Sequence, residues 1–210
     1  MNGYEYEKQY REQGYRVICG IDEAGRGPLA GDVYAAAVIL PEGIEIDGLD
    51  DSKKLSEKKR EELFEIICER AEAYNIASAS VEEIDRVNIL QATFLAMRRA
   101  LDGLSIRPDF ALVDGNRDPL LSVPSAQIVK GDSLSKSISA ASILAKVSRD
   151  RYMKELAVKY PQYAFEKHKG YGTKLHYERL REYGISDVHR KTFLKKYLEE
   201  IRNEQRNIVV

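Results

Sequence analysis

Two strand-like apolar runs flank a turn with adjacent carboxylates and glycines, and this stretch limits the possible fold more than any other. Residues 17–40 read VICGIDEAGRGPLAGDVYAAAVIL. The β-branched residues before Asp22 and those around Val33 predict two buried strands. The neighbouring carboxylates of Asp22 and Glu23 are costly at the end of a buried strand, because an unpaired charge loses its hydration there. A divalent metal ion would remove that cost, and a tight hairpin with solvated charges is the alternative.

The turn after the carboxylates contains Gly25, Arg26 and Gly27. Glycine allows backbone conformations that other residues avoid, and it lets a ligand approach the main chain. The guanidinium of Arg26 can offer its planar set of donors to a phosphate. We set aside a nucleotide-binding glycine loop, because the glycines are spaced GxGxxxG and a second strand follows where a helix would be needed.

Two further strand-like runs lead into acids. Residues 109–114, DFALVD, end on Asp114, and residues 126–130 lead through Gly131 into Asp132. In an α/β sheet ligands gather at strand ends, so acids from separate strands can converge there. Clustered carboxylates repel one another, and hard cations such as Mg²⁺ or Mn²⁺ relieve that repulsion. Two such ions about 3.5–4 Å apart can activate water for phosphodiester hydrolysis; unrelated turn residues at strand ends are the alternative.

Charge is distributed unevenly along the 210 residues, although the net charge is only −1. From Lys130 onward there are 18 Lys and Arg against 10 Asp and Glu, which predicts a polyanionic partner or, alternatively, solvated helix faces.

Cys19 and Cys68 are the only cysteines, so a disulfide framework and a cysteine-based zinc site are excluded. The polar N-terminus is neither a signal peptide nor a membrane span, so we expect a cytoplasmic protein and no membrane partner. A monomer is expected, because no broad apolar stripe is left without a place in the core.

The order of strand and helix patterns predicts an α/β domain with a mixed sheet. A capping box at Ser80 and Glu83 predicts the start of one long helix that continues to Leu101. On the helix expected over 135–160, small residues would face a sheet, and Lys146 and Arg149 are expected to point largely outward. The remaining expected elements are a strand at 74–80 and helices at 56–73, 174–183 and 190–205.

The motifs together resemble the ribonuclease HII family. The likeness extends from about residue 16 to about residue 195 and includes six segments: GIDEAGRGPLAG at 20–31, DSKKL at 51–55, VDGN at 113–116, KGDS at 130–133, SAASILAKVSRDRYM at 139–153 and HKGYGT at 168–173. It implies a ribonuclease H-like mixed sheet flanked by helices. The sister family, ribonuclease HIII, is disfavoured because Arg26 is present and only about fifteen residues precede the first strand. We expect one catalytic domain over 1–210, in which about 160–210 form a basic helical part that binds substrate.

The resemblance also implies an activity and its residues. It implies a metal-dependent endoribonuclease that cuts on the 5′ side of ribonucleotides, in RNA–DNA hybrids and at single ribonucleotides embedded in duplex DNA, and leaves 3′-hydroxyl and 5′-phosphate ends. Mg²⁺ or Mn²⁺ would act in a two-metal mechanism. The residues that match the family's site are the acids Asp22, Glu23, Asp114 and Asp132, the loop Gly25, Arg26 and Gly27 that senses the ribose 2′-hydroxyl, and Tyr171, which packs against the sugar. Lys53 and Lys136 are candidate phosphate contacts, with a solvated role as the alternative.

Two other functions remain open at this point. One is a nucleic-acid-binding module that keeps the fold without catalysis, although all four acids are present. The other is a nuclease of the same fold that cuts DNA junctions or long hybrids. The histidines at 168, 176 and 189 are interpreted as structural or substrate-side residues, because the acids suffice as metal ligands.

Overall fold

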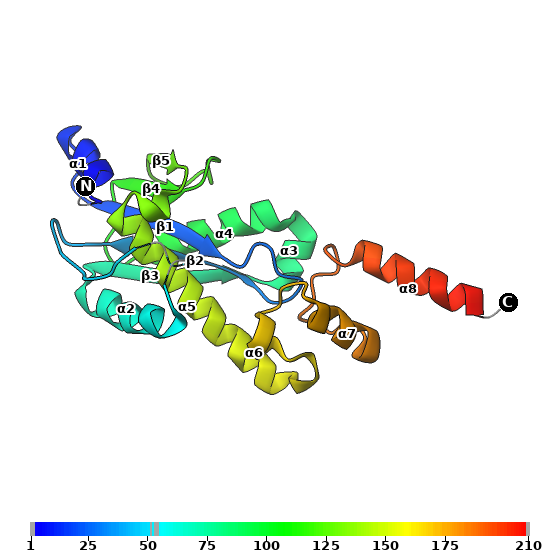
Figure 1. The fold of residues 1–210 in the computed structure, drawn as a ribbon. Helices are drawn as coiled ribbons and strands as arrows, with labels where there is room; N and C mark the ends of the chain where they lie inside the picture. The colour runs from blue at the N-terminus through cyan, green and yellow to red at the C-terminus, as the bar shows by residue number, and fades with distance from the viewer. Residues whose placement is uncertain (1–2, 51, 53–54, 209–210) are drawn as a thin grey trace.

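A five-stranded mixed sheet forms the centre of the computed structural model, which describes residues 3–50, 52 and 55–208 (Figure 1). The strand order is β3-β2-β1-β4-β5. β1 pairs antiparallel with β2 and parallel with β4. The outer strand β3 pairs antiparallel with β2, and the outer strand β5 pairs parallel with β4. The strands are β1 Ile18–Ala24, β2 Val33–Ile39, β3 Ala73–Ala79, β4 Phe110–Asp114 and β5 Ser125–Ile128. The predicted mixed sheet flanked by helices is therefore confirmed.

Helices cover both faces of this sheet. The helices are α1 Glu5–Glu12, α2 Glu57–Arg70, α3 Val81–Val87, α4 Ile89–Asp102, α5 Lys136–Lys159, α6 Phe165–His168, α7 Lys174–Tyr183 and α8 Lys195–Ile208, with short 3₁₀ turns η2 Gly131–Ser133 and η3 Pro161–Tyr163. α4 packs on one face against side chains such as Ile21 and Ala35, and α5 packs with α2 on the other face against Ala36 and Val38. α8 extends away from the body of the molecule (Figure 1). Within the described ranges, no helix is both long and apolar enough to cross a membrane.

α5 lies unusually close to β1 because small residues meet at their contact. Ser139, Ala140, Ala141 and Ser142 are all buried, as the run of small residues predicted. At Gly20 a Cβ atom would lie 2.1 Å from the carbonyl carbon of Ser137, so only glycine fits there. This close approach brings α5 next to the strand that carries Asp22 and Glu23.

The expected long helix after Ser80 is two helices, so that prediction was wrong in part. The capping box of Ser80 and Glu83 is present. α3 then stops at Val87, because Asn88 adopts a φ of 70° and its side chain accepts the backbone N–H groups of Leu90 and Gln91 to cap α4. Asparagine tolerates a positive φ and caps helices well, which favours the break at this position.

The last helix begins at Lys195, five residues later than the expected start at 190. The chain before it pairs with the loop between β1 and β2. The backbone N–H of Gly31 donates to Val188 (2.8 Å), and that of Arg190 donates to Leu29 (2.8 Å). These hydrogen bonds hold residues 188–190 against the loop between β1 and β2, and the helix begins only after this segment.

Candidate active site

Three separate segments bring the four predicted acids to one edge of the sheet. Asp22 and Glu23 lie on β1, and the parallel pairing of Ile21 with Val113 places Asp114 on the adjacent strand. The backbone N–H of Gly131 donates to Asp114 Oδ1 (2.7 Å), so the η2 turn lies beside β4 and carries Asp132 to the same edge. Asp22 and Asp132 are buried.

The acids influence one another's ionisation. Burial raises the pKa of Asp22 well above its usual range, and the charges of Glu23, Asp114 and Asp132 raise it further. Arg26 approaches Glu23, with 3.4 Å between Nη1 and Oε1. Among the described residues, no three Asp, Glu, His or Cys side chains are gathered as a ready set of metal ligands. The hard oxygen donors and the mutual repulsion of the acids both fit a divalent cation.

The glycine loop and Tyr171 meet beside the acids. Gly25 has a φ of 98°, and a Cβ atom there would lie 2.0 Å from Arg149 Nε. At Gly27 a Cβ atom would lie 3.5 Å from Tyr171 Cε1, so the tyrosine ring lies over this glycine. The Tyr171 side chain is 45% exposed, which leaves the ring available to a ligand. The predicted ribose-sensing residues thus lie together, from parts of the chain about 145 residues apart.

Two buried arginines hold the loop between β1 and β2 by hydrogen bonds to its carbonyl oxygens. Arg190 donates to the carbonyl oxygens of Gly25 (2.6 Å), Arg26 (2.9 Å) and Gly31 (2.7 and 2.9 Å). Its pKa is lowered to about 9 by burial and by the charge of Arg149. The guanidinium therefore fixes the carbonyl groups on both sides of the turn.

Arg149 is the second of these arginines, and its expected outward position was wrong. Its side chain is 1% exposed, and it donates to the carbonyl oxygens of Ala30 (3.3 Å), Asp32 (3.3 Å) and Lys169 (3.2 Å). It joins the glycine loop to the segment before Tyr171. Helical periodicity predicts that a charged residue of α5 is exposed. The one sequence feature that pointed to a functional role for Arg149 was its position in the family-like segment 139–153.

The three histidines are buried next to one another, and they are linked to the backbone around Tyr171. His189 Nδ1 accepts the backbone N–H of Ser186 (3.0 Å), so its Nε2 carries the proton that faces His176 Nε2 (3.1 Å). His176 can then donate through Nδ1 to the carbonyl oxygen of Tyr171 (3.0 Å). His168 accepts the N–H of Gly170 (3.2 Å). All three rings are neutral in this arrangement, which fits the structural role, one of the two alternatives expected for them.

The buried histidines predict that the protein loses stability in acid. Burial lowers the pKa of His176 and that of His189 to about 4 each, below the value of about 6.5 in an unfolded chain. Between these values the unfolded state binds more protons, so the free energy of unfolding falls as the pH is lowered from about 6.5 to about 4, by up to ~3 kcal/mol per histidine. Urea unfolding across this range measures the slope. His176→Asn, which cannot titrate, should have a shallower slope, and an equal slope would contradict the prediction.

The two candidate phosphate lysines differ in what the structure describes. Lys53 lies outside the described residues, as does most of the predicted DSKKL motif. Lys136 begins α5, and its ammonium donates to the carbonyl oxygen of Leu49. It lines a cavity of about 640 Å³ that also touches Asp132. The phosphate role of both lysines stays a prediction.

Comparison with known proteins gives the family. The family model for ribonuclease HII matches residues 19–197. The chain is 55% identical over 197 residues to the ribonuclease HII of Caldicellulosiruptor bescii, which covers 94% of this chain and 96% of that protein. It is 60% identical over 177 residues to the ribonuclease HII of Janthinobacterium sp. (strain Marseille), with 84% of each chain covered. The chain belongs to the ribonuclease HII family. As a ribonuclease HII it is an endoribonuclease, a hydrolase of RNA.

Solved structures of ribonuclease HII proteins have the same fold. The ribonuclease H2 of Pyrococcus horikoshii superimposes with a TM-score of 0.74 at 29% identity, over 89% of this chain and 99% of that one. The ribonuclease HII of Archaeoglobus fulgidus, solved in a complex with PCNA, has a TM-score of 0.67 at 27% identity, over 83% and 94% of the two chains. The expected ribonuclease H-like fold is confirmed on this basis.

Proposed function

We propose that this ribonuclease HII cuts the strand on the 5′ side of a ribonucleotide, in RNA–DNA hybrids and at single ribonucleotides in duplex DNA. Asp22, Glu23, Asp114 and Asp132 would hold two divalent ions, Mg²⁺ or Mn²⁺. The observation that supports this most is the placement of these acids from β1, β4 and η2 at one sheet edge, beside the loop of Gly25 and Gly27. A distant fold relative at 18% identity, a ribonuclease HIII, was solved in complex with Mn²⁺.

Each group of residues has a separate task in this proposal. Bound divalent ions would supply the Lewis acidity that activates water and stabilises the leaving oxygen. The backbone of Gly25 and Gly27 can approach the ribose 2′-hydroxyl, the group that distinguishes RNA from DNA. The ring of Tyr171 offers a flat apolar face to the neighbouring sugar. Arg26 can turn from Glu23 to a phosphate of the strand.

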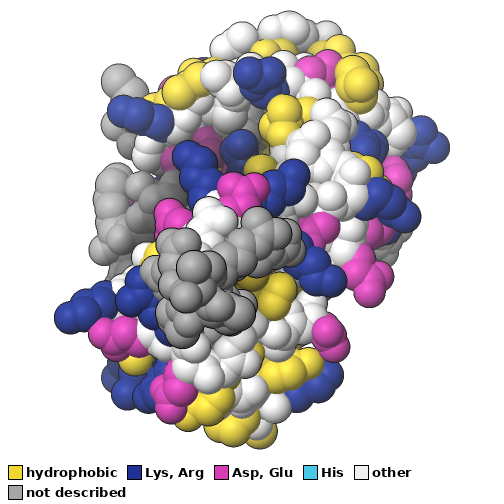
Figure 2. Space-filling view, turned by 90° about the vertical axis from the view of Figure 1, so that its right-hand side faces the viewer, with side chains coloured by type: hydrophobic (Ala, Val, Ile, Leu, Met, Phe, Trp, Pro, Cys, Tyr) yellow, Lys and Arg dark blue, Asp and Glu magenta, His cyan; other side chains and the backbone are white. Residues whose placement is uncertain are grey.

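The C-terminal part would bind the duplex through its basic side chains. Figure 2 views the molecule from the end at which α8 projects, and Lys and Arg side chains are scattered over this face among acidic ones. We propose that residues 160–210 track the phosphate backbone as part of one catalytic domain, and that the enzyme acts as a monomer. The expected cytoplasmic location stays a prediction.

A panel of duplexes tests the substrate class. The purified chain, with Mg²⁺ or Mn²⁺ added separately, is given duplexes with zero, one and four ribonucleotides in one strand. We expect cleavage of the last two with 3′-hydroxyl and 5′-phosphate ends, and no cleavage of the all-DNA duplex. Cleavage of all-DNA duplexes, or none of any duplex, would refute the proposal.

The same panel tests the residues that sense the junction. Tyr171→Ala is expected to reduce kcat/KM on the single-ribonucleotide duplex by about 10-fold or more, because full burial of a large apolar side chain contributes about 1.5–3 kcal/mol. Tyr183→Ala is the matched control, because Tyr183 is also an exposed tyrosine of the C-terminal part, at 49%, and has no place in the site. Equal effects of the two substitutions would exclude the proposed role of Tyr171.

A further inference from the structure

A carboxylate of the N-terminal helix is buried, and the proposed function gives it no task. Glu7 lies on α1 and is 5% exposed. α1 packs against the start of β4, where the ring of Tyr10 stacks on that of Phe110 with 4.0 Å between the ring centroids. A buried carboxylate is costly unless hydrogen-bond donors replace the water that it loses. The donors that Glu7 meets therefore decide what this side chain does.

Glu7 accepts two hydrogen bonds from the start of α5. Its Oε1 accepts the hydroxyl of Ser135 (2.7 Å) and the backbone N–H of Ser137 (3.1 Å). The carbonyl oxygen of Gly3, just before α1, accepts the backbone N–H of Lys136 (2.9 Å). The first N–H groups of a helix have no partner inside that helix. The N-terminal segment thus supplies partners that α5 itself cannot provide.

The charge of Glu7 also suits this position. The first turn of α5 contains no Asp or Glu, and it begins with Lys136, whose charge is unfavourable at the positive end of the helix dipole. The carboxylate of Glu7 brings a negative charge to this end from 128 positions away along the chain. Glu7 therefore stabilises the start of α5 by hydrogen bonds and by charge.

The start of α5 in turn holds the η2 turn that carries Asp132. The backbone N–H of Ser135 donates to the carbonyl oxygen of Gly131 (2.9 Å), the residue before Asp132. At Gly131 a Cβ atom would lie 2.6 Å from Ile138 Cδ1, so η2 lies directly against the first turn of α5. The backbone N–H of Gly131 also donates to Asp114. A shift of Ser135 would therefore move Asp132 relative to Asp114.

We propose that Glu7 is a positioning residue for Asp132. It holds Ser135 and Ser137 at the start of α5, and the start of α5 holds the η2 turn. The proposal rests on the proposed function, in which Asp132 is a metal ligand. Groups that orient a metal ligand contribute about 10–100-fold to metal affinity or activity. α1 then acts on catalysis through Asp132.

Two substitutions separate the reach of Glu7 from its charge. Glu7→Gln keeps an acceptor oxygen at the same distance and loses the charge, whereas Glu7→Asp keeps the charge and withdraws the carboxylate by one methylene group. Binding of Mn²⁺ to the full chain, measured by EPR without duplex, should weaken about 10-fold in Glu7→Asp and stay within about 3-fold of wild type in Glu7→Gln. If Glu7→Asp binds Mn²⁺ as tightly as the wild-type chain, or no more weakly than Glu7→Gln, the proposal is overturned.

Cleavage kinetics separate positioning from stability. On the single-ribonucleotide duplex, Glu7→Asp should lower kcat about 10-fold at limiting Mn²⁺, leave the KM for the duplex unchanged, and recover when more Mn²⁺ is added. Ser80→Ala is the stability control, because it removes the N-cap of α3, which carries none of the four acids. It should lower the thermal unfolding midpoint and leave Mn²⁺ binding unchanged. If a lower midpoint is the sole effect of Glu7→Asp, Glu7 is merely structural and the proposal fails.

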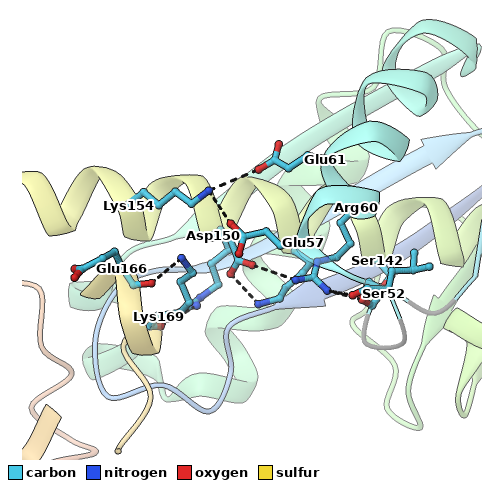
Figure 3. A network of polar contacts seen from close by, with 12 residues as sticks. Ser52, Glu57, Arg60, Glu61, Ser142, Asp150, Lys154, Glu166 and Lys169 are labelled. Carbon is cyan, nitrogen blue, oxygen red and sulfur yellow. Dashed lines mark hydrogen bonds and ion pairs between the residues drawn. The ribbon is translucent and has the colours of Figure 1, made fainter. Parts of the chain in front are cut away.

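Glu57→Asp is the matched control for a carboxylate that joins another helix to α5. Glu57 of α2 pairs with Lys154 of α5 (2.8 Å), as Figure 3 shows, and Lys154 lies in the second half of α5, away from η2. Glu57→Asp should therefore leave Mn²⁺ binding and kcat unchanged. A loss of Mn²⁺ affinity equal to that of Glu7→Asp would mean that any disturbance of α5 has this effect, and it would contradict the role of Glu7.

An Asp132→Asn background tests whether Glu7 acts through Asp132. In this background Glu7→Asp should weaken Mn²⁺ binding by less than about 2-fold, because the ligand that Glu7 positions is already lost and the two effects are not additive. A further loss as large as in the wild-type background would overturn the proposal. Failure of the proposed function is distinguishable, because Asp132→Asn alone would then leave both Mn²⁺ binding and cleavage at the wild-type level.

Discussion

Asp22→Asn is expected to abolish cleavage of a single-ribonucleotide duplex, with a loss of at least ~10³-fold in kcat. Asparagine has nearly the same shape as aspartate and can still accept the backbone N–H of Glu23 (2.7 Å). It cannot supply the negative charge that a divalent cation requires. Binding of the duplex should largely survive, because the basic and aromatic contacts remain.

The same substitution should not harm folding. Burial and neighbouring acids raise the pKa of Asp22, so its charged form is unfavourable in the folded chain when no cation is bound. Removal of that charge should leave the thermal unfolding midpoint without metal equal to or above the wild-type value. Asp47→Asn, on an exposed loop outside the site, is the control and should change neither rate nor stability. Substantial activity in Asp22→Asn would refute its role as a metal ligand.

Arg190→Met is expected to have the largest effect on stability, a loss of about 3 kcal/mol or more. It leaves the buried carbonyl oxygen of Gly31 and the partly buried carbonyl oxygens of Gly25 and Arg26 without their donor, and an unpaired buried group costs about 1–3 kcal/mol. The methionine fills much of the volume, so a cavity is not the main cause. Urea unfolding gives the change in the free energy of unfolding.

The folded fraction of Arg190→Met should also lose its preference for ribonucleotides, because the glycine loop is no longer held in place. Arg179→Met is the matched control. Arg179 lies half-buried on α7 and pairs with Glu182 (2.8 Å), and the loss of this pair should cost less than about 1 kcal/mol. If the two arginine variants were destabilised equally, or if Arg190→Met kept full discrimination at the junction, the role assigned to Arg190 would be wrong.

Strands and helix starts were predicted well where short-range sequence patterns alone determine them. Short apolar runs predicted the strands that carry Asp22 and Asp114, and the capping box predicted the start of α3. The break at Asn88 was missed because one asparagine in an apolar helical pattern has little weight, although its side chain and positive φ cap the next helix. Helix ends depend on such single residues more than on periodicity.

Side-chain environments were harder to predict than elements. Helical periodicity placed Arg149 outward, because a charged side chain is seldom buried without a carboxylate partner. Here its partners are carbonyl groups of the loop at 30–32 and of Lys169, and no pattern within α5 points to them.

The sequence by itself determined the strands, the acids that follow them and membership in the ribonuclease HII family, because apolar periodicity and contiguous motifs are local properties. Only the tertiary structure decided what holds the glycine loop and what holds the start of α5. Arg190 and Gly25 are 165 positions apart, and Glu7 and Ser135 are 128 apart. Buried polar groups must find partners, and in a folded chain the nearest partner in space is often far away along the sequence.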